Sequence, residues 1–406
     1  MREAKMQPID YVKALTFVRR GGSEQELKAA KLISSWLSEM GYKPKLEHFH
    51  IYDAVVKAGK LALIGSGKEF PVMPVGLSKS GYVEGKLTIV HAPEPELVDK
   101  NSLRDMIVLT SNPPRRKWLK LFVEAGAKAV LVVVANHREK AVMMLSQALA
   151  EDLGKKIMVG SIAYKHAVKL IEEKPESVSL SLHHEVKLSE SQNVVAELPG
   201  ESERLVVLTA HYDSTPCSPG AQDNAAGTAE LLEVAKKLFG KRFFRRVRFV
   251  FCGSEEKGLL GSKAHVALHA YELEKMDLVV NLDVGGNPFV RIFAKTIGTD
   301  ELKSFVKAAL FEHGIPAEVR METYSSDGMP FSRYGVPSVS LGRGGVEYKA
   351  HSPYDTPDAV CNVALVEIAN AAEVLVEKVA NARLLPFERR ISDEMRKKVE
   401  DYFQQR

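Results

Sequence analysis

The sequence has few cysteines and little net charge, and each scarcity excludes a class of protein. Its three cysteines, Cys217, Cys252 and Cys361, are too few and too widely spaced for a disulfide framework or a Cys-x-x-Cys metal site. A formal net charge of +4 over 406 residues gives no reason to expect nucleic acid or a membrane surface as a partner. The one dense basic run, 241–249, lies where a helix gives way to a strand, and we expect solvated charge there.

Long apolar runs are also missing. The longest, such as 129–135, fall far short of the ~20 residues that a helix needs to span a bilayer. Residues 1–15 contain no apolar stretch followed by a small-residue cleavage site, so the sequence predicts no secretory signal and a cytoplasmic location. Hydrophobic residues at 45% and charged residues at 27% are typical of a globular protein.

The pattern of apolar residues divides the chain. A capping box at Ser23 and Glu26 begins a helix that Gly41 ends. Short β-rich runs follow, with one helix-like piece at 115–126, and then buried strands alternate with helices, which favours a mostly parallel sheet covered on both faces. The predicted domains are a discontinuous α/β domain of 1–53 and 190–385, an inserted β-rich domain of 54–189, and a charged C-terminal helix within 386–406.

Within the second part of that α/β domain, five segments carry metal-compatible side chains at or just after a predicted strand end. In parallel sheets, ligands gather at the loops beyond the carboxyl ends of the strands, so these side chains can converge. Taken singly each is weak, since Asp223, for example, could simply cap the helix that follows it. The candidates are His211 and Asp213, Asp223, the pair Glu255 and Glu256, Asp283, and His351.

Two imidazoles with several carboxylates make a nitrogen-and-oxygen site that suits zinc, and cobalt or manganese remain possible substitutes. Five ligands are too many for one tetrahedral ion with an open position, but they suit two ions ~3.5–4 Å apart that share a carboxylate. Of the adjacent Glu255 and Glu256, one can bind metal while the other takes a proton from a water between the ions. Asp213 could receive the second N–H of His211 and so fix its tautomer.

Four segments resemble the motifs of the dinuclear-zinc aminopeptidase family, metallopeptidase family twenty-eight: HYDSTPCSPGAQDNAAGTAELLEVA, CGSEEKGLLGS, NLDVGG and HSPYDTPD. The resemblance covers 1–53 and 190–382 and implies a three-layer α/β/α fold with a mixed, mostly parallel central sheet. It implies that Asp223 bridges two Zn²⁺ ions, with His211 and Asp283 completing one and Glu256 and His351 the other. Glu255 then matches the general base, and Asp213 the carboxylate behind His211.

The family resemblance extends to the insert and shows two departures. Segments of 54–189 look like a protease-associated domain, which in the family covers or shapes the substrate cleft. Gly328 stands where the family usually has a histidine, and Ala350 where some relatives have a tyrosine that donates to the oxyanion. Tyr324 and Tyr348 are the candidates for that role here, unless zinc alone polarises the carbonyl. We expect no metal ligand among His48, His50, His183 and His184.

The resulting hypothesis is a zinc exopeptidase, an aminopeptidase acting on peptides through a metal-bridged hydroxide with Glu255 as general base. A carboxypeptidase or dipeptidase is the alternative, and it would need a cationic pocket, for which Arg333 and Arg343 are available. A single-zinc cyclase and a non-catalytic binding protein, as in the transferrin receptor, are more remote. Side-chain preference and oligomeric state stay open, although four residues hint at an apolar pocket: Phe289, Met329, Phe331 and Val346.

Overall fold

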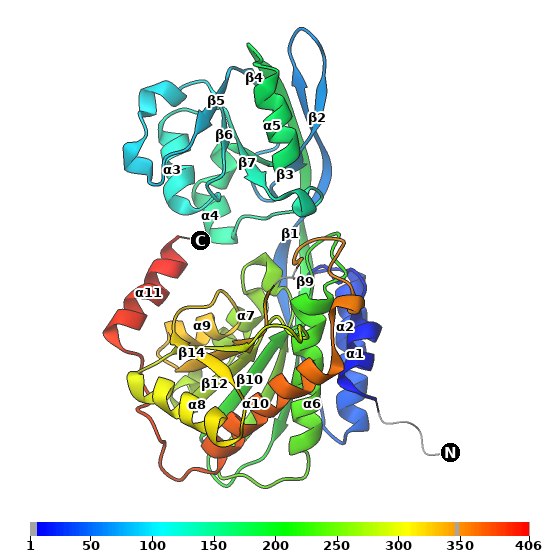
Figure 1. Cartoon of the computed structure of the whole chain (residues 1–406), viewed down its shortest axis with the longest axis vertical. Coiled ribbons are helices and arrows are strands. Elements are labelled where there is room, and N and C mark those ends of the chain that lie inside the picture. The colour runs from blue at the N-terminus through cyan, green and yellow to red at the C-terminus, as the bar shows by residue number, and fades with distance from the viewer. Residues whose placement is uncertain (1–5, 346–348, 406) are drawn as a thin grey trace. The chain divides into compact units, whose positions relative to one another are not determined.

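The computed structural model describes residues 6–345 and 349–405, and the chain divides into two compact units. Unit 1 comprises Met1–Ile51 and Glu190–Asp401, and unit 2 comprises Tyr52–Ser189 and Tyr402–Arg406. The long strands β1 and β9 supply segments to both units (Figure 1). The charged tail contains a helix, α11, but most of it belongs to unit 1.

The sheet of unit 1 has the strand order β14-β13-β15-β12-β10-β11-β9-β1. Its four central strands, β11, β10, β12 and β15, are mutually parallel, whereas β9 and β13 join them antiparallel. The expectation of a mostly parallel sheet therefore holds for the centre but not for the flanks. The strands are β1 Lys45–Leu63, β9 Val178–Leu198, β10 Leu205–His211, β11 Arg246–Cys252, β12 Met276–Leu282, β13 Ile292–Ile297, β14 Ala317–Met321 and β15 Ser338–Gly342.

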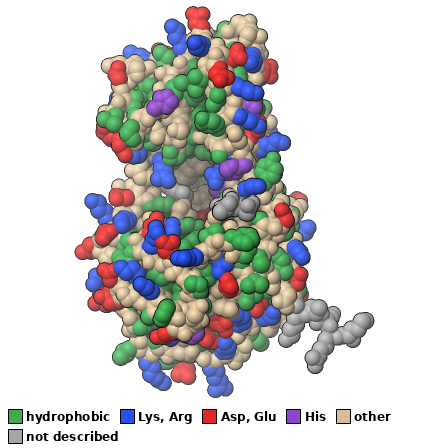
Figure 2. All heavy atoms as spheres, viewed as in Figure 1, with side chains coloured by type: hydrophobic (Ala, Val, Ile, Leu, Met, Phe, Trp, Pro, Cys, Tyr) green, Lys and Arg blue, Asp and Glu red, His purple; other side chains and the backbone are tan. Residues whose placement is uncertain are grey.

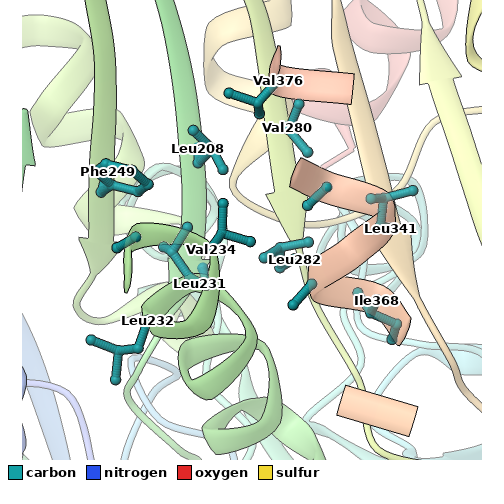
Figure 3. Close-up of a cluster of buried hydrophobic side chains, with 14 of the residues drawn as sticks. Leu208, Leu231, Leu232, Val234, Phe249, Val280, Leu282, Leu341, Ile368 and Val376 are labelled. Carbon is teal, nitrogen blue, oxygen red and sulfur yellow. The ribbon is translucent and has the colours of Figure 1, made fainter. Parts of the chain in front are cut away.

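Helices cover both faces of this sheet because its buried strands send alternate side chains to opposite sides. Along β10, Val206 and Leu208 join the larger core cluster, and Leu205 and Val207 join the smaller one. Figure 3 shows the larger cluster, where α6 and α10 pack against the strands. The helices of unit 1 are α1 Pro8–Leu15, α2 Glu24–Glu39, α6 Gly227–Leu238, α7 Leu260–Leu268, α8 Asp300–Glu312, α9 Gly328–Arg333, α10 Asn362–Asn381 and α11 Asp393–Gln404.

Unit 2 contains more helix than the sequence predicted. Its five-stranded sheet has the order β3-β8-β7-β6-β5, in which β5 to β8 run parallel. Parallel neighbours need crossover connections, and α3 and α4 lie in those between β6, β7 and β8. The elements are β2 Glu69–Pro71, β3 Met73–Pro74, β4 Gly81–Gly85, β5 Leu87–Val90, β6 Ile107–Thr110, β7 Ala129–Val134, β8 Met158–Ala163, α3 Arg116–Glu124, α4 Gln147–Asp152 and α5 Tyr164–Glu172.

Helix α1 precedes α2, which is the first helix that the sequence predicts. With eight residues α1 is too short to be stable alone, so burial of Tyr11, Val12 and Leu15 in the core must hold it in place. Its eight residues make only about two turns, too few to give a clear helical period. Tertiary packing therefore defines this helix.

The surface agrees with the weak net charge, since basic and acidic side chains are interspersed over the face in view (Figure 2). Across the described residues, no helix is both long enough and apolar enough to cross a membrane. The predicted location stays a prediction.

Gly342, the last residue of β15, gives a test of packing at the strand ends. A Cβ at this position would lie 2.2 Å from the backbone oxygen of Asp283 and 2.6 Å from the ring of Phe293. We expect Gly342→Ala to lower the free energy of unfolding by about 1–3 kcal/mol, since backbone must shift to admit the methyl group. Urea denaturation measures the change.

Gly344→Ala is the matched control, because among the described residues no atom beyond its chain neighbours lies within 4 Å of a Cβ at that position. It should change stability by no more than about 0.5 kcal/mol. Equal stability of the two variants would contradict the packing argument.

Candidate metal centre

The candidate residues come from the carboxyl ends of neighbouring strands. His211 is the last residue of β10, and Asp283 directly follows the parallel neighbour β12. Asp223 lies in the turn Ala221–Ala226 that precedes α6. Because parallel strands end at the same edge of the sheet, residues far apart in sequence meet here.

The structure brings His211, Asp223 and Asp283 together in a first group. The Nε2 atom of His211 lies 3.1 Å from Oδ1 of Asp223 and 3.3 Å from Oδ1 of Asp283. All three residues are buried. One imidazole nitrogen thus faces two carboxylates at a spacing that a cation could occupy.

Asp223, Glu256 and His351 form a second group. Nε2 of His351 lies 3.2 Å from Oδ2 of Asp223 and 3.0 Å from Oε2 of Glu256. Asp223 therefore turns one oxygen toward each group. The His351 side chain is 33% exposed, whereas that of His211 is 1% exposed, so the second group is the more open to solvent.

The turn that carries Glu255 and Glu256 follows β11 and is held by Asp213. The backbone N–H groups of Glu255 and Glu256 donate to the Asp213 carboxylate at 2.9 and 3.3 Å. Nδ1 of His211 lies 3.4 Å from Oδ1 of Asp213, beyond the usual range for an N–H···O bond. Asp213 thus contacts this turn more closely than the imidazole that the sequence assigned to it.

Glu26 contributes to the same turn, which corrects its predicted role. Ser23 does accept from the N–H of Glu26, as a capping box requires. The Glu26 carboxylate, however, accepts from the N–H of Ser254 at 2.8 Å and from the hydroxyl of Ser191 at 3.0 Å. Burial raises the pKa of Glu26 to about 8. The other carboxylate oxygen of Glu26 accepts from the backbone N–H of Gly22 at 2.6 Å, where a capping box would use that of Ser23.

Two residues that the sequence analysis missed hold the Asp223 turn. The Asp355 carboxylate accepts from the backbone N–H groups of Gln222 and Asp223 at 2.7 and 3.1 Å. Asn224 donates to the backbone oxygen of Leu282 at 2.9 Å, and its Oδ1 caps α6 by accepting from Gly227. Asp223 is therefore not needed as a cap. Asp355 lies within the HSPYDTPD motif, which was the available signal.

Arg19 is fully buried and anchors the loop between His211 and Asp223. Its guanidinium donates to the backbone oxygens of Tyr212 at 2.6 Å, Pro219 at 2.6 Å and Gly220 at 2.9 Å. Burial lowers the pKa of Arg19 to about 10, so it stays cationic at neutral pH. A single arginine far from the motifs gave no signal in the sequence.

The site holds more negative charge than the chain balances. Burial, together with neighbouring carboxylates, raises the pKa of Glu255 and of Glu256. Burial alone would lower the pKa of His211 and of His351, yet the surrounding carboxylates raise it well above the ordinary value. Among the described residues, no hydrogen bond satisfies Oε1 of Glu256 or Oδ1 of Asp283. These oxygen and nitrogen donors, with one shared carboxylate, therefore fit divalent cations.

Of the two tyrosines predicted as oxyanion donors, Tyr324 lies within the described residues. Tyr324 contacts the ring of Phe293 with centroids 5.2 Å apart. Burial and the charges of Asp283 and Asp223 raise its pKa, which places Tyr324 within electrostatic reach of the centre. Tyr348 and Val346 lie outside the described residues.

Of the residues that hinted at an apolar pocket, two are buried, as core packing would equally explain. Met329 and Phe331 are completely buried, and Phe331 belongs to the smaller core cluster. Phe289 is exposed. A Cβ at Gly328 would lie 3.3 Å from the Ser338 side chain, so a larger residue at this position would require a small shift of that side chain.

The two arginines proposed for a cationic pocket differ in their exposure to solvent. Arg343 is buried and donates to the Glu367 carboxylate and to the backbone oxygen of Asn287. Arg333 is exposed and lies at the end of α9. Arg343 is therefore already paired within the fold.

Comparison with known proteins decides the family. Residues 193–376, which include all five candidate ligands, match the family model of peptidase family M28. They form an M28 domain.

Several relatives of this chain are named aminopeptidases. Aminopeptidase YwaD of Bacillus subtilis (strain 168) is 26% identical over 403 residues, which cover 95% of this chain and 86% of that protein. A probable leucine aminopeptidase 2 of Arthroderma benhamiae is 33% identical, over 37% of this chain and 33% of its own length. The structure of a zinc aminopeptidase from Bacillus subtilis has the same fold, with a TM-score of 0.76 and 23% identity over 94% of this chain and 98% of that one.

Asp355 offers a test of how the M28 centre is held. In Asp355→Ala the N–H groups of Gln222 and Asp223 lose their acceptor, so the Asp223 carboxylate should be less firmly placed. We expect zinc affinity to fall about 10–100-fold, measured by competition with a chromogenic chelator.

Asp358→Ala is the control, because Asp358 is exposed and its side chain bonds the neighbouring Thr356. It should bind zinc like the unaltered protein. A zinc affinity of Asp355→Ala equal to that of Asp358→Ala would show that Asp355 does not position the site.

Proposed function

We propose that this protein is a zinc-dependent aminopeptidase that removes N-terminal residues from peptides. The observation that carries the proposal is the position of Asp223, which offers one oxygen to His211 and one to His351. The names of the relatives, an aminopeptidase and leucine aminopeptidases, support the same activity. A non-catalytic binding protein would have no need for the complete ligand set and an adjacent base.

Two zinc ions would be held in this centre, and cobalt or manganese would suit the same donors. His211 and Asp283 would hold one ion, Glu256 and His351 the other, and Asp223 both. When bound, the ions would supply Lewis acidity to the scissile carbonyl and make a nearby water acidic. The remaining steps fall to the chain's own side chains.

Glu255 would act as the general base. Its carboxylate would take a proton from the attacking water and return it to the nitrogen of the leaving amine. Burial raises the pKa of Glu255, and a higher pKa makes a carboxylate a stronger proton acceptor. Asp213 and Glu26, through the turn that they hold, would aim Glu255.

The charge of the site favours a free amine over a free carboxylate in the substrate. An α-ammonium group is attracted by carboxylates such as Glu256 and Asp283, whereas a C-terminal carboxylate needs a cationic partner. Arg343 cannot easily serve, because it is buried against Glu367. Tyr324 remains our candidate for a contact with the substrate carbonyl.

A paired assay tests the proposed specificity. The zinc-loaded protein should hydrolyse amino-acid p-nitroanilides and leave N-blocked dipeptides intact, and a chelator should abolish the activity. If only the blocked dipeptides were hydrolysed, the protein would be a carboxypeptidase and not an aminopeptidase. No turnover of either substrate class would argue for a binding protein.

Glu255→Gln tests the assignment of the base. The amide cannot accept the proton, so kcat should fall about 10²–10⁴-fold while the zinc content stays unchanged. The control is Glu201→Gln at an exposed position, which should keep full activity. Near-normal turnover of the Glu255 variant would contradict the assignment of Glu255 as the general base.

A further inference from the structure

A second group of metal-compatible side chains lies in unit 1 and shares no residue with the centre around Asp223. It consists of Glu47 on β1, His265 on α7, and His269 at the end of α7. The two histidines are four residues apart, so they lie on one face of the helix with ring centroids 4.3 Å apart. Both rings face the same carboxylate.

The distances place three donor atoms around one point. Oε2 of Glu47 lies 2.7 Å from Nδ1 of His265, and Oε1 lies 2.8 Å from Nε2 of His269. Zinc binds nitrogen and oxygen at about 2.0–2.1 Å, so neighbouring ligand atoms stand roughly 3.0–3.4 Å apart. Widening the present contacts by about half an ångström would admit an ion.

The ring of His269 has carboxylates on both of its nitrogens. Besides Glu47 at Nε2, Oε2 of Glu272 lies 3.0 Å from Nδ1. A neutral imidazole has a single N–H, so it can donate to only one of the two carboxylates. An ion at Nε2 would resolve this conflict, because Nδ1–H would then donate to Glu272, as a carboxylate does behind many metal-bound histidines.

The charges around the group leave room for a cation. Glu272 is paired with Arg246 at 2.8 Å and Arg248 at 2.9 Å, and Glu197 accepts from both arginines. The carboxylates of Glu47, Glu197 and Glu272 exceed these two guanidiniums by one charge. With neutral imidazoles, the group is therefore net negative.

The group is also accessible and free to change its tautomer. His265 is completely buried and packs near Phe331, whereas the side chains of Glu47 and His269 are 14% and 15% exposed. Without an ion, Nδ1–H of His265 donates to the Glu47 carboxylate, and among the described residues its Nε2 has no hydrogen-bond partner. An ion that arrives from the exposed side would take the lone pair of Nδ1 while the proton moves to Nε2.

We propose that Glu47, His265 and His269 form a further binding site for a divalent transition-metal ion of the zinc class. Two imidazoles favour such an ion over magnesium or calcium, and three protein ligands leave a position for water. The ion would tie β1 to α7, the helix that follows the turn of Glu255 and Glu256. The proposal does not depend on the proposed peptidase activity.

Zinc counting in a variant that lacks the shared carboxylate of the first centre tests this site. Metal-free protein is dialysed against buffered free zinc, and bound zinc is measured by plasma mass spectrometry. Asp223→Asn should lose the zinc of the first centre yet retain about one ion per chain. Adding His269→Gln should remove that ion, and Glu47→Gln in the same background should weaken it by about 10-fold or more.

His48→Gln in the Asp223→Asn background is the matched control. His48 lies on the same strand, and its Nδ1 is 2.9 Å from the Glu190 carboxylate, but it is not part of the group. This variant should keep the retained ion. Zinc should also raise the unfolding temperature of Asp223→Asn but not of the double variant with His269→Gln, which checks that the double variant folds.

Equal zinc binding by Asp223→Asn with and without His269→Gln would overturn the proposal. A different result would count against the dinuclear centre instead, namely that Asp223→Asn binds as much zinc as the unaltered protein. In that case the loss caused by His269→Gln in the unaltered background still decides the second site.

Discussion

Repulsion between buried carboxylates is the constraint on which the rest of this site depends. Asp213, Asp223, Glu255 and Asp283 are each at most 9% exposed, and the side chain of Glu256 is 9% exposed. Burial first, and then the like charge of neighbouring carboxylates, opposes ionisation and raises the pKa of Glu255 and Glu256. Such a group of side chains relaxes apart unless the backbone around it is fixed. A site that attracts cations is therefore also one that needs rigid supports.

The supports are strand ends and buried polar contacts to the backbone. His211 and Asp283 are attached to adjacent strands, so their separation is set by the sheet. Asp223 does not lie at the end of a strand. Hydrogen bonds of Asp355 and Asn224 hold its turn in place instead. Each such contact satisfies a buried N–H or C=O group that would otherwise lack a partner. The same hydrogen bonds thus lower the free-energy cost of burying these backbone groups and fix the positions of the site residues.

The sequence could predict the groups attached to regular structure. Buried strands have a clear pattern, and their carboxyl ends mark where His211 and Asp283 must lie. Arg19 and Glu26 could not be found in this way, because their partners are about two hundred residues away in the chain. Glu26 was even assigned a local role that its position beside Ser23 makes reasonable. In unit 2 the sequence indicated α3 but neither α4 nor α5, and α4 has only six residues, which leave little room for a helical period.

These distant partners show that the site is not contained within the residues that match peptidase family M28. Arg19 and Glu26 precede the matched segment 193–376, and unit 2 separates them from it in sequence. Strands β1 and β9 are neighbours in the sheet. The chain leaves unit 1 along β1 and re-enters it at Glu190, along β9. Without the N-terminal segment, the backbone oxygen of Tyr212 and the N–H of Ser254 would lose their buried partners. The geometry of the metal centre therefore depends on a segment that lies outside the family match.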